Sequence, residues 1–132
     1  MRSFVLKHKI LTASIAALTG LILWQAFWSF TASGRGEIVA RYDISRGHYE
    51  VLGYGLPAAW RPEYARLLQE RYVVKFRPVA GCIVSTGLVA YVDSYNRVST
   101  EAVNRKFGHD VFKECSYEAR KKWLDIRKLA KE

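Results

Sequence analysis

The stretch GYGLPA, residues 53–58, follows the loose pattern G-x-G-x-x-G/A that can wrap the phosphates of a dinucleotide. That chemistry needs backbone amides at a helix N-terminus and a carboxylate about 20 residues further on. Pro57 removes one of the amides, and the next predicted strand ends at Arg77 and Pro78 without a carboxylate. We therefore expect Gly53 and Gly55 to let a strand bend sharply before Pro57, rather than to hold a nucleotide.

The chain has two cysteines, Cys82 and Cys115, and both follow the apolar N-terminal segment. In an oxidising compartment the simplest expectation is a disulfide between them. Such a bridge closes a loop of about 34 residues and contributes roughly 3–4 kcal/mol in the chain-entropy model. Two buried free thiols are the alternative. Redox or metal chemistry is not favoured, because the sequence has no Cys-x-x-Cys motif.

Histidine chemistry is also poorly supported. His109, Asp110 and Cys115 are the nearest approach to a metal-ligating set, but His109 and Cys115 are six residues apart and point to different sides of a helix. Neither G-x-S-x-G nor H-E-x-x-H occurs. The sequence therefore predicts no catalytic residue, no cofactor and no metal.

Basic residues near the end of the chain are the main binding candidates. One interpretation is a solvated helix face whose cations favour the helix C-terminus. The other is contact with an anionic surface, either lipid headgroups or a cell-envelope polymer. Nucleic acid is not expected as a partner. The candidate contact residues are Arg120, Lys121, Lys122, Arg127 and Lys128.

The N-terminal segment determines the class of protein. Residues 10–33 carry no charge, and these 24 residues exceed the roughly 20 that a helix needs to cross a bilayer. Four aromatic residues cluster toward the far end, as is typical of a membrane interface. They are Trp24, Phe27, Trp28 and Phe30. The alternatives are a signal peptide cut after Ser33 and a buried soluble helix, and the length of the apolar run favours an uncleaved signal anchor.

The flanking charges give an expected orientation. Arg2, Lys7 and Lys9 precede the apolar run and favour a cytoplasmic N-terminus at residues 1–9. Residues 34–132 would then form an extracytoplasmic domain of a single-pass protein, as in a bacterial inner membrane facing the periplasm. That part carries 18 Lys+Arg against 12 Asp+Glu, which favours anionic partners.

The pattern of the remaining residues predicts an α+β domain. After a short linker, TASGRG, alternation over residues 37–44 and 49–55 predicts a hairpin. A helix follows over 60–72, with Pro62 and Glu63 in its first turn, and then a strand over 73–79. Two helices complete the order β-β-α-β-α-α, with a sheet of about three strands covered by helices on one face.

The boundaries of the last two helices have alternatives. Ser85 is a suitable N-cap for the first, and Asn96 could end it early. Residues 99–131 form an amphipathic helix with Cys115 near the centre of its apolar face. Gly108 either lies inside that helix or breaks it, with Asp110 as a fresh N-cap.

No catalytic constellation emerges, so the sequence favours a non-catalytic interaction module held near the membrane. Its partner would be an integral-membrane protein or a second copy, and Ala16 and Gly20 form a small-xxx-small pair that suits helix pairing. One alternative is a binder of anionic lipid or polymer through the basic C-terminal helix. The other is a small membrane-anchored enzyme with a pocket near Gly53–Trp60.

Overall fold

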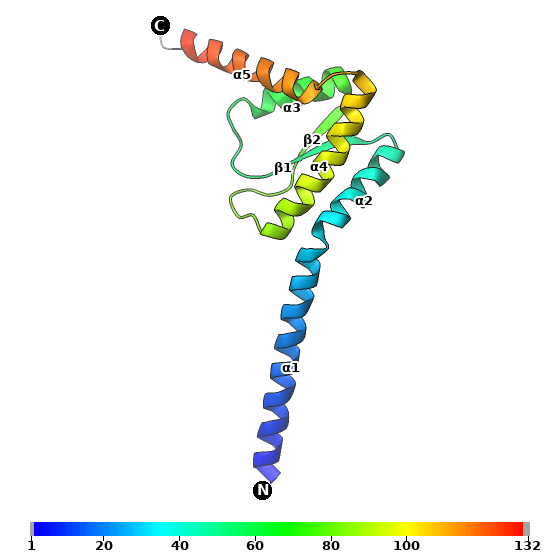
Figure 1. Ribbon diagram of the computed structural model, residues 1–132. Helices are drawn as coiled ribbons and strands as arrows, with labels where there is room; N and C mark the ends of the chain where they lie inside the picture. The colour runs from blue at the N-terminus through cyan, green and yellow to red at the C-terminus, as the bar shows by residue number, and fades with distance from the viewer. Residues whose placement is uncertain (1, 131–132) are drawn as a thin grey trace.

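A computed structural model describes residues 2–130 of the chain, and the side chains of residues 12–130. Figure 1 shows a long N-terminal helix that carries a small mixed head, residues 32–130. The elements are α1 (Arg2–Phe30), α2 (Ala32–Ser45), β1 (Tyr49–Gly53), α3 (Arg61–Tyr72), β2 (Val74–Pro78), α4 (Thr86–Phe107) and α5 (Val111–Leu129).

Helix α1 projects away from the head, and its residues Thr12–Phe30 are long and apolar enough to cross a membrane. None of this 19-residue stretch is buried against the head, so its apolar side chains are available to contact lipid. Length and composition therefore agree with a membrane span. The side chains of Arg2, Lys7 and Lys9 lie outside the described residues.

The predicted linker and the first predicted strand are wrong. Residues 32–45 form helix α2 instead, and α1 leads into it with a single turn residue, Thr31, between them. The small residues Ala32, Gly36 and Ala40 recur every fourth position and are buried. They form the stripe along which α2 packs against α4, because small side chains let two helix backbones approach closely. Ile38 and Tyr42, which suggested a strand, are exposed.

The predicted strand-helix-strand unit is confirmed. β1 and β2 pair in parallel, with Tyr49 opposite Val74 and Gly53 opposite Pro78. α3 connects them, with a proline in its first turn and the acidic Glu63 near the positive end of its dipole. Because the first predicted strand is helical, the described residues form a sheet of two strands rather than three, and no hairpin is present among them.

Side chains of α4 form hydrogen bonds with backbone groups of β1 that a neighbouring strand would otherwise bond. The Asn96 side chain donates to the Leu52 carbonyl oxygen and accepts from the Leu52 backbone N–H, both at 2.8 Å. The Ser99 hydroxyl donates to the carbonyl oxygen of Glu50. These bonds compensate strand groups that would otherwise be unpaired in a two-stranded sheet. Asn96 therefore acts inside α4, which continues to Phe107, and does not end it.

The sheet is covered on both faces, not on one. Val51 belongs to an apolar cluster with residues of α3 and α5, including Leu68 and Cys115. Its neighbour Leu52 belongs to a second cluster with residues of α2 and α4, including Ala40 and Tyr95. Successive residues of a strand point to opposite faces, so β1 separates these two halves of the core.

The last two helices are separated at Gly108, which is the second of the two alternatives, and residues 99–107, assigned to the last helix from the sequence, belong to α4 instead. Ser85 caps α4 by accepting a hydrogen bond from the backbone N–H of Leu88. Gly108 ends α4 with φ at 77°, a conformation that suits glycine. The Asp110 side chain then caps α5 by accepting from the backbone N–H of Lys113. α5 consequently turns away from α4 and lies along α3 (Figure 1).

Candidate functional site

A groove of aromatic and charged side chains lies between α3, β2 and α5, and we call it the far groove. It has a volume of about 490 Å³. A second hollow of about 450 Å³ continues it along α5 and adds Glu114, Tyr117 and Arg120. In Figure 1 the helices that build it lie at the end of the head farthest from the start of α1. Its lining residues are Trp60, Arg61, Tyr64, Phe76, Asp110, Phe112, Lys113 and Ser116.

The far groove has an aromatic floor with cations at its edge. Tyr64 packs edge-to-face against both Trp60 and Phe76, with ring centroids 5.8 Å and 6.0 Å away. The guanidinium of Arg120 lies 4.5 Å from the centroid of the Trp60 ring, and that of Arg61 lies 5.6 Å from Phe76. Burial raises the pKa of the Tyr64 hydroxyl to about 12, so it stays protonated. Such a surface suits partners with apolar and acidic groups.

The basic residues predicted from the sequence do not form one free patch. Arg120 lies over Trp60, and Arg127 lies over Trp123 with 5.3 Å between its guanidinium and the ring centroid. Lys122 donates to Glu63 at 2.8 Å. Lys121 and Lys128 are exposed. Part of the predicted anionic-contact surface is therefore used to fasten α5 to the rest of the head.

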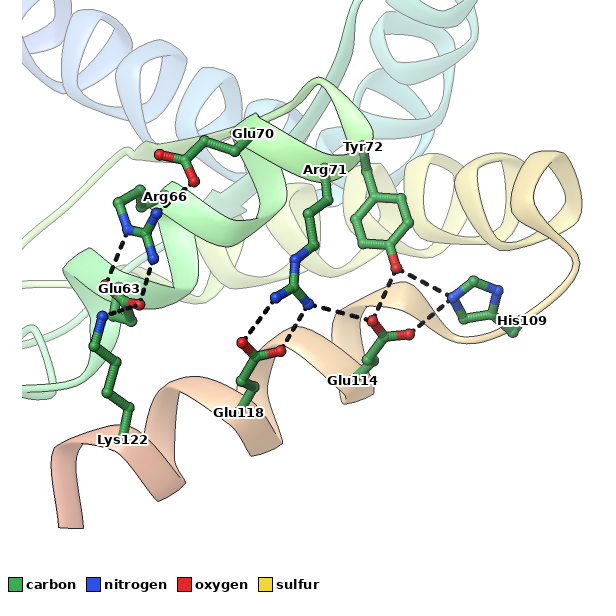
Figure 2. Close-up of polar contacts among 9 residues, drawn as sticks. All are labelled: Glu63, Arg66, Glu70, Arg71, Tyr72, His109, Glu114, Glu118 and Lys122. Atoms are coloured by element: carbon green, nitrogen blue, oxygen red, sulfur yellow. Dashed lines mark hydrogen bonds and ion pairs between the residues drawn. The ribbon is translucent and has the colours of Figure 1, made fainter. Parts of the chain in front are cut away.

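On its other flank, α5 is joined to α3 by a row of ion pairs, shown in Figure 2 and here called the polar seam. Arg71 donates two hydrogen bonds to the Glu118 carboxylate, at 2.6 and 2.8 Å. Glu63 accepts from both Arg66 and Lys122, and Arg66 also pairs with Glu70. Hydrogen bonds from Arg66 and Lys122 lower the pKa of the Glu63 carboxyl to about 2. The seam therefore favours the ionised form of the Glu63 carboxylate.

One part of the polar seam contains residue types that can also move protons. The Glu114 carboxylate accepts from the Tyr72 hydroxyl at 3.0 Å, and its other oxygen lies 2.9 Å from His109 Nε2. Arg71 lies 3.5 Å from the first of these oxygens. Burial, and then the hydrogen bond to Glu114, raise the pKa of Tyr72. Neighbouring side chains contact both oxygens of Glu114. This arrangement suits a structural contact between helices better than a general base.

A cavity of about 710 Å³ lies where α1 meets the head, and we call it the neck cavity. α1 contributes Gln25, Ala26, Trp28 and Ser29, α2 contributes Arg35, and the start of α4 contributes Ser85, Gly87, Leu88 and Tyr91. Arg35 Nη2 donates to the Trp28 carbonyl oxygen at 2.7 Å, and its guanidinium lies 3.7 Å from the Trp28 ring centroid. The cavity therefore combines a fixed cation with aromatic and apolar walls.

The predicted disulfide is wrong. Cys82 is exposed in the segment between β2 and α4, whereas Cys115 is fully buried in α5 beneath the sheet, and both are free. Burial, reinforced by the nearby Glu114 charge, raises the pKa of the Cys115 thiol to about 11. Cys115 therefore fills the core as a small apolar group, and its predicted place at the centre of the buried face of α5 is confirmed.

The two glycines of the dinucleotide-like stretch have separate packing reasons. Gly55 has φ at 82°, which allows the chain to turn after β1. A Cβ at Gly53 would collide with the Phe76 ring from β2. The bend expected from the sequence is therefore present, and the Gly53 position also makes room for the groove floor. Trp60 lines the far groove, whereas Gly53 does not.

The predicted interface aromatics lie on the surface of α1. Trp24 and Trp28 stack with centroids 6.1 Å apart, and Phe27 and Phe30 are exposed. Trp28 also borders the neck cavity.

Sequence reasoning missed Arg35 and the far-groove residues Tyr64, Phe76 and Phe112 as a joint surface. The i, i+4 repeat of small residues from Ala32 was a signal that a helix continues past the membrane segment and places Arg35 beside Trp28. The groove had no comparable signal, because its residues come from three elements.

Within the described residues, no three His, Cys, Asp or Glu side chains gather as a metal site would require. Comparison with protein-family models, with curated proteins and with solved structures finds no match for this chain.

Proposed function

We propose that the chain is a membrane-anchored, non-catalytic interaction module whose head docks a partner protein in the far groove. α1 is the anchor, and the head would stand on the extracytoplasmic side, as the charges before the span favour. The observation that carries the proposal is the far groove itself: an aromatic floor with cations at its edge, on the part of the head farthest from α1.

The location of α5 bears on the kind of partner. α4 starts beside Ser29 of α1, since a Cβ at Gly87 would lie 3.3 Å from the Ser29 hydroxyl oxygen. α4 has 22 residues, so it extends about 33 Å before α5 begins. Figure 1 shows α4 leading away from α1. Headgroups of the bilayer that holds α1 are therefore poor candidates for contact with α5, and a partner that reaches the far end of the head is favoured.

Charge favours an acidic partner over a second copy of this chain. The whole chain has a formal net charge of +9. The far groove carries Arg61, Lys113 and Arg120 at its edge, against Asp110 and Glu114. Complementary charge speeds association and selects partners, whereas two equally basic surfaces repel each other. We infer that the partner presents acidic side chains together with aromatic or aliphatic ones that fill the groove.

Site-specific crosslinking in the cells that make the protein tests the proposal. A photo-reactive residue at Tyr117, which is 71% exposed beside the groove, should give one crosslinked product of constant mass. The same probe at Val73, also 71% exposed but at the end of α3, is the matched control and should not give that product.

Charge reversal then identifies the surface. Arg120→Glu and Lys113→Glu should reduce the Tyr117 product at least about tenfold, whereas Lys121→Glu, exposed on α5 outside the groove, should not. A product of twice the chain mass would show that the partner is a second copy of this chain and not an acidic protein. A product with an anionic polymer, or equal yields from both probe positions, would contradict the proposal.

Sidedness is measured by thiol labelling of intact cells. Lys121 is exposed on α5 and Cys115 is buried, so in a chain that carries Cys82→Ser a membrane-impermeant maleimide should modify Lys121→Cys if the head is outside. Labelling that requires opening of the membrane would place the head in the cytoplasm and overturn the extracytoplasmic part of the proposal.

A further inference from the structure

We propose that the neck cavity binds the phosphate-bearing headgroup of an anionic phospholipid. The inference rests on the membrane anchoring of α1 but not on any partner in the far groove. It concerns a different part of the molecule, the cavity among α1, α2 and the start of α4.

The depth of the cavity is the first argument. The candidate span Thr12–Phe30 has 19 residues, which as a helix is about 29 Å long, close to the roughly 30 Å of a bilayer hydrocarbon core. Gln25, Ala26, Trp28 and Ser29 lie in the last two turns of this span. The neck cavity therefore lies at the boundary between hydrocarbon and headgroups, where lipid phosphates are found.

The hydrogen-bonding state of Arg35 is the second argument. One end of the guanidinium donates to the Trp28 carbonyl oxygen, and its plane is held against the Trp28 ring. Its Nε is buried and has no hydrogen-bond partner within the part of the chain that the structure describes. A buried polar group without a partner is unfavourable, and a small shift of the side chain toward the cavity would let a phosphate oxygen accept from Nε. The planar guanidinium also matches phosphate geometry better than a lysine does.

The rest of the lining completes a site for an amphipathic ligand. Hydroxyls of Ser29 and Ser85 and the Gln25 amide supply neutral polar groups. Ala26, Trp28 and Leu88 supply apolar contact for the glycerol and the first acyl carbons. The N-terminus of α4 adds its positive dipole end. The volume of about 710 Å³ is in the range of ordinary small-molecule sites.

The segment between β2 and α4 favours a lipid over free phosphate. Ile83 in this segment is 93% exposed, and it is two residues from Ser85 of the cavity. Figure 1 shows this segment at the end of the head nearest α1. An exposed isoleucine side chain gains free energy when it moves from water into acyl chains. We infer that Ile83 dips into the same leaflet whose headgroup enters the neck cavity.

Native mass spectrometry of the full chain tests the site. The purified chain in detergent is offered equimolar phosphatidylglycerol and phosphatidylcholine, and the wild type should retain phosphatidylglycerol preferentially. Arg35→Gln should weaken that retention about tenfold or more, the loss expected for one charge-assisted hydrogen bond. Arg41→Gln removes the same charge from an exposed position of α2 and is the matched control, which should retain the lipid as the wild type does.

A second variant keeps the test independent of the charge. Ala26→Phe fills the cavity from α1, where Ala26 is exposed and is not part of the head core, so folding of the head should not change. It should also reduce phosphatidylglycerol retention. Unchanged retention in both Arg35→Gln and Ala26→Phe, or an equal loss in Arg41→Gln, would overturn the proposal.

Three further measurements separate the sources of failure. Millimolar inorganic phosphate should not displace the bound lipid. If it does, the neck cavity binds free anions rather than a lipid headgroup, and the proposal is overturned. An environment-sensitive fluorophore on Cys82 should shift to shorter wavelength in phosphatidylglycerol vesicles, and no shift would contradict insertion of the Ile83 segment. Flotation of the wild type with vesicles of phosphatidylcholine alone reports the anchor itself, so loss of flotation marks a failure of the anchor and not of the neck cavity.

Discussion

The two halves of the head are held together by different physical means. Next to α1, α2 and α4 approach so closely that Gly36 lies against the Tyr91 carbonyl oxygen and Ser94. Hydrogen bonds from Ser94 to the Ser33 carbonyl oxygen and from Tyr95 to Asp43 cross the same contact. In the far half, Val111, Cys115 and Ala119 of α5 lie in one apolar cluster with Leu67 and Leu68 of α3, and an exposed row of ion pairs bridges the two helices.

This difference indicates which half of the head can accept substitutions without unfolding. A contact of small residues has no spare volume, so an added methyl group must move a backbone. Exposed ion pairs each contribute little, and long side chains can rearrange around a substitution. The half next to α1 is therefore the rigid support, and the far half with its groove is the part in which side chains can adapt to a partner.

The largest expected effect comes from Gly36→Ala. The new Cβ would collide with atoms of α4, including the Tyr91 backbone, and we expect the free energy of unfolding to fall by about 2–3 kcal/mol. Gly34→Ala is the matched control, because a Cβ there would meet no atom of the described residues within 4 Å. It should raise stability by up to about 1 kcal/mol. Urea unfolding of the full chain in detergent measures both, and equal effects would contradict the close contact.

The next largest effect is expected from Asn96→Ala. This substitution removes both hydrogen bonds to Leu52 and leaves the N–H and carbonyl of a buried strand residue without their partner. We expect a loss of about 2 kcal/mol in unfolding free energy. Asp93→Ala, exposed on the same helix, should change stability by less than about 0.5 kcal/mol. If Asn96→Ala behaved like Asp93→Ala, α4 would not be completing the β1 edge.

A stabilising change is expected in the far half at Val73. This residue ends α3 with φ at 56° and ψ at 35°, a left-handed conformation that is unfavourable for a β-branched side chain. Val73 is 71% exposed, so little packing is lost on truncation. Val73→Gly should raise the unfolding free energy by about 1 kcal/mol, as measured by the shift of the urea midpoint. Val73→Ala keeps the Cβ and should gain less, and a larger gain in the alanine variant would refute the explanation.

The smallest effect concerns acid stability of the polar seam. The pKa of Glu63 is lowered in the folded chain from 4.5 to about 2, so its ionised form stabilises the fold above about pH 4.5. This contribution is lost as the pH falls from about 4.5 toward 2. Glu63→Gln should therefore cost less than about 1 kcal/mol at pH 7 and should reduce the loss of stability over that pH range. Unfolding at a series of pH values checks this.

A control for the acid experiment is Glu101→Gln, which breaks an exposed ion pair with Arg105 within α4. It removes a carboxylate outside the polar seam, so an effect that it shares with Glu63→Gln would not be due to the seam. If Glu63→Gln and the wild type lost stability in parallel below pH 4.5, the polar seam would not be the source of the acid sensitivity.

Several features followed from the sequence alone because they depend on neighbours within one turn or one strand. The apolar stretch that ends near Phe30, the helix that starts at Arg61, the strand at Val74 and the caps at Ser85 and Asp110 are of this kind. Chain-local spacing and side-chain chemistry decide each of them. The buried face of α5 around Cys115 was predictable for the same reason.

Only the tertiary structure decided whether Ala32, Gly36 and Ala40 belong to a flexible linker or to a helix contact, because that depends on α4, more than 40 residues away. It likewise decided that Cys82 and Cys115 stay apart, and that Asn96 takes the place of a neighbouring strand. Both candidate binding surfaces are of this second kind. The far groove and the neck cavity are each assembled from three elements, and local periodicity carries no information about which distant side chains will meet.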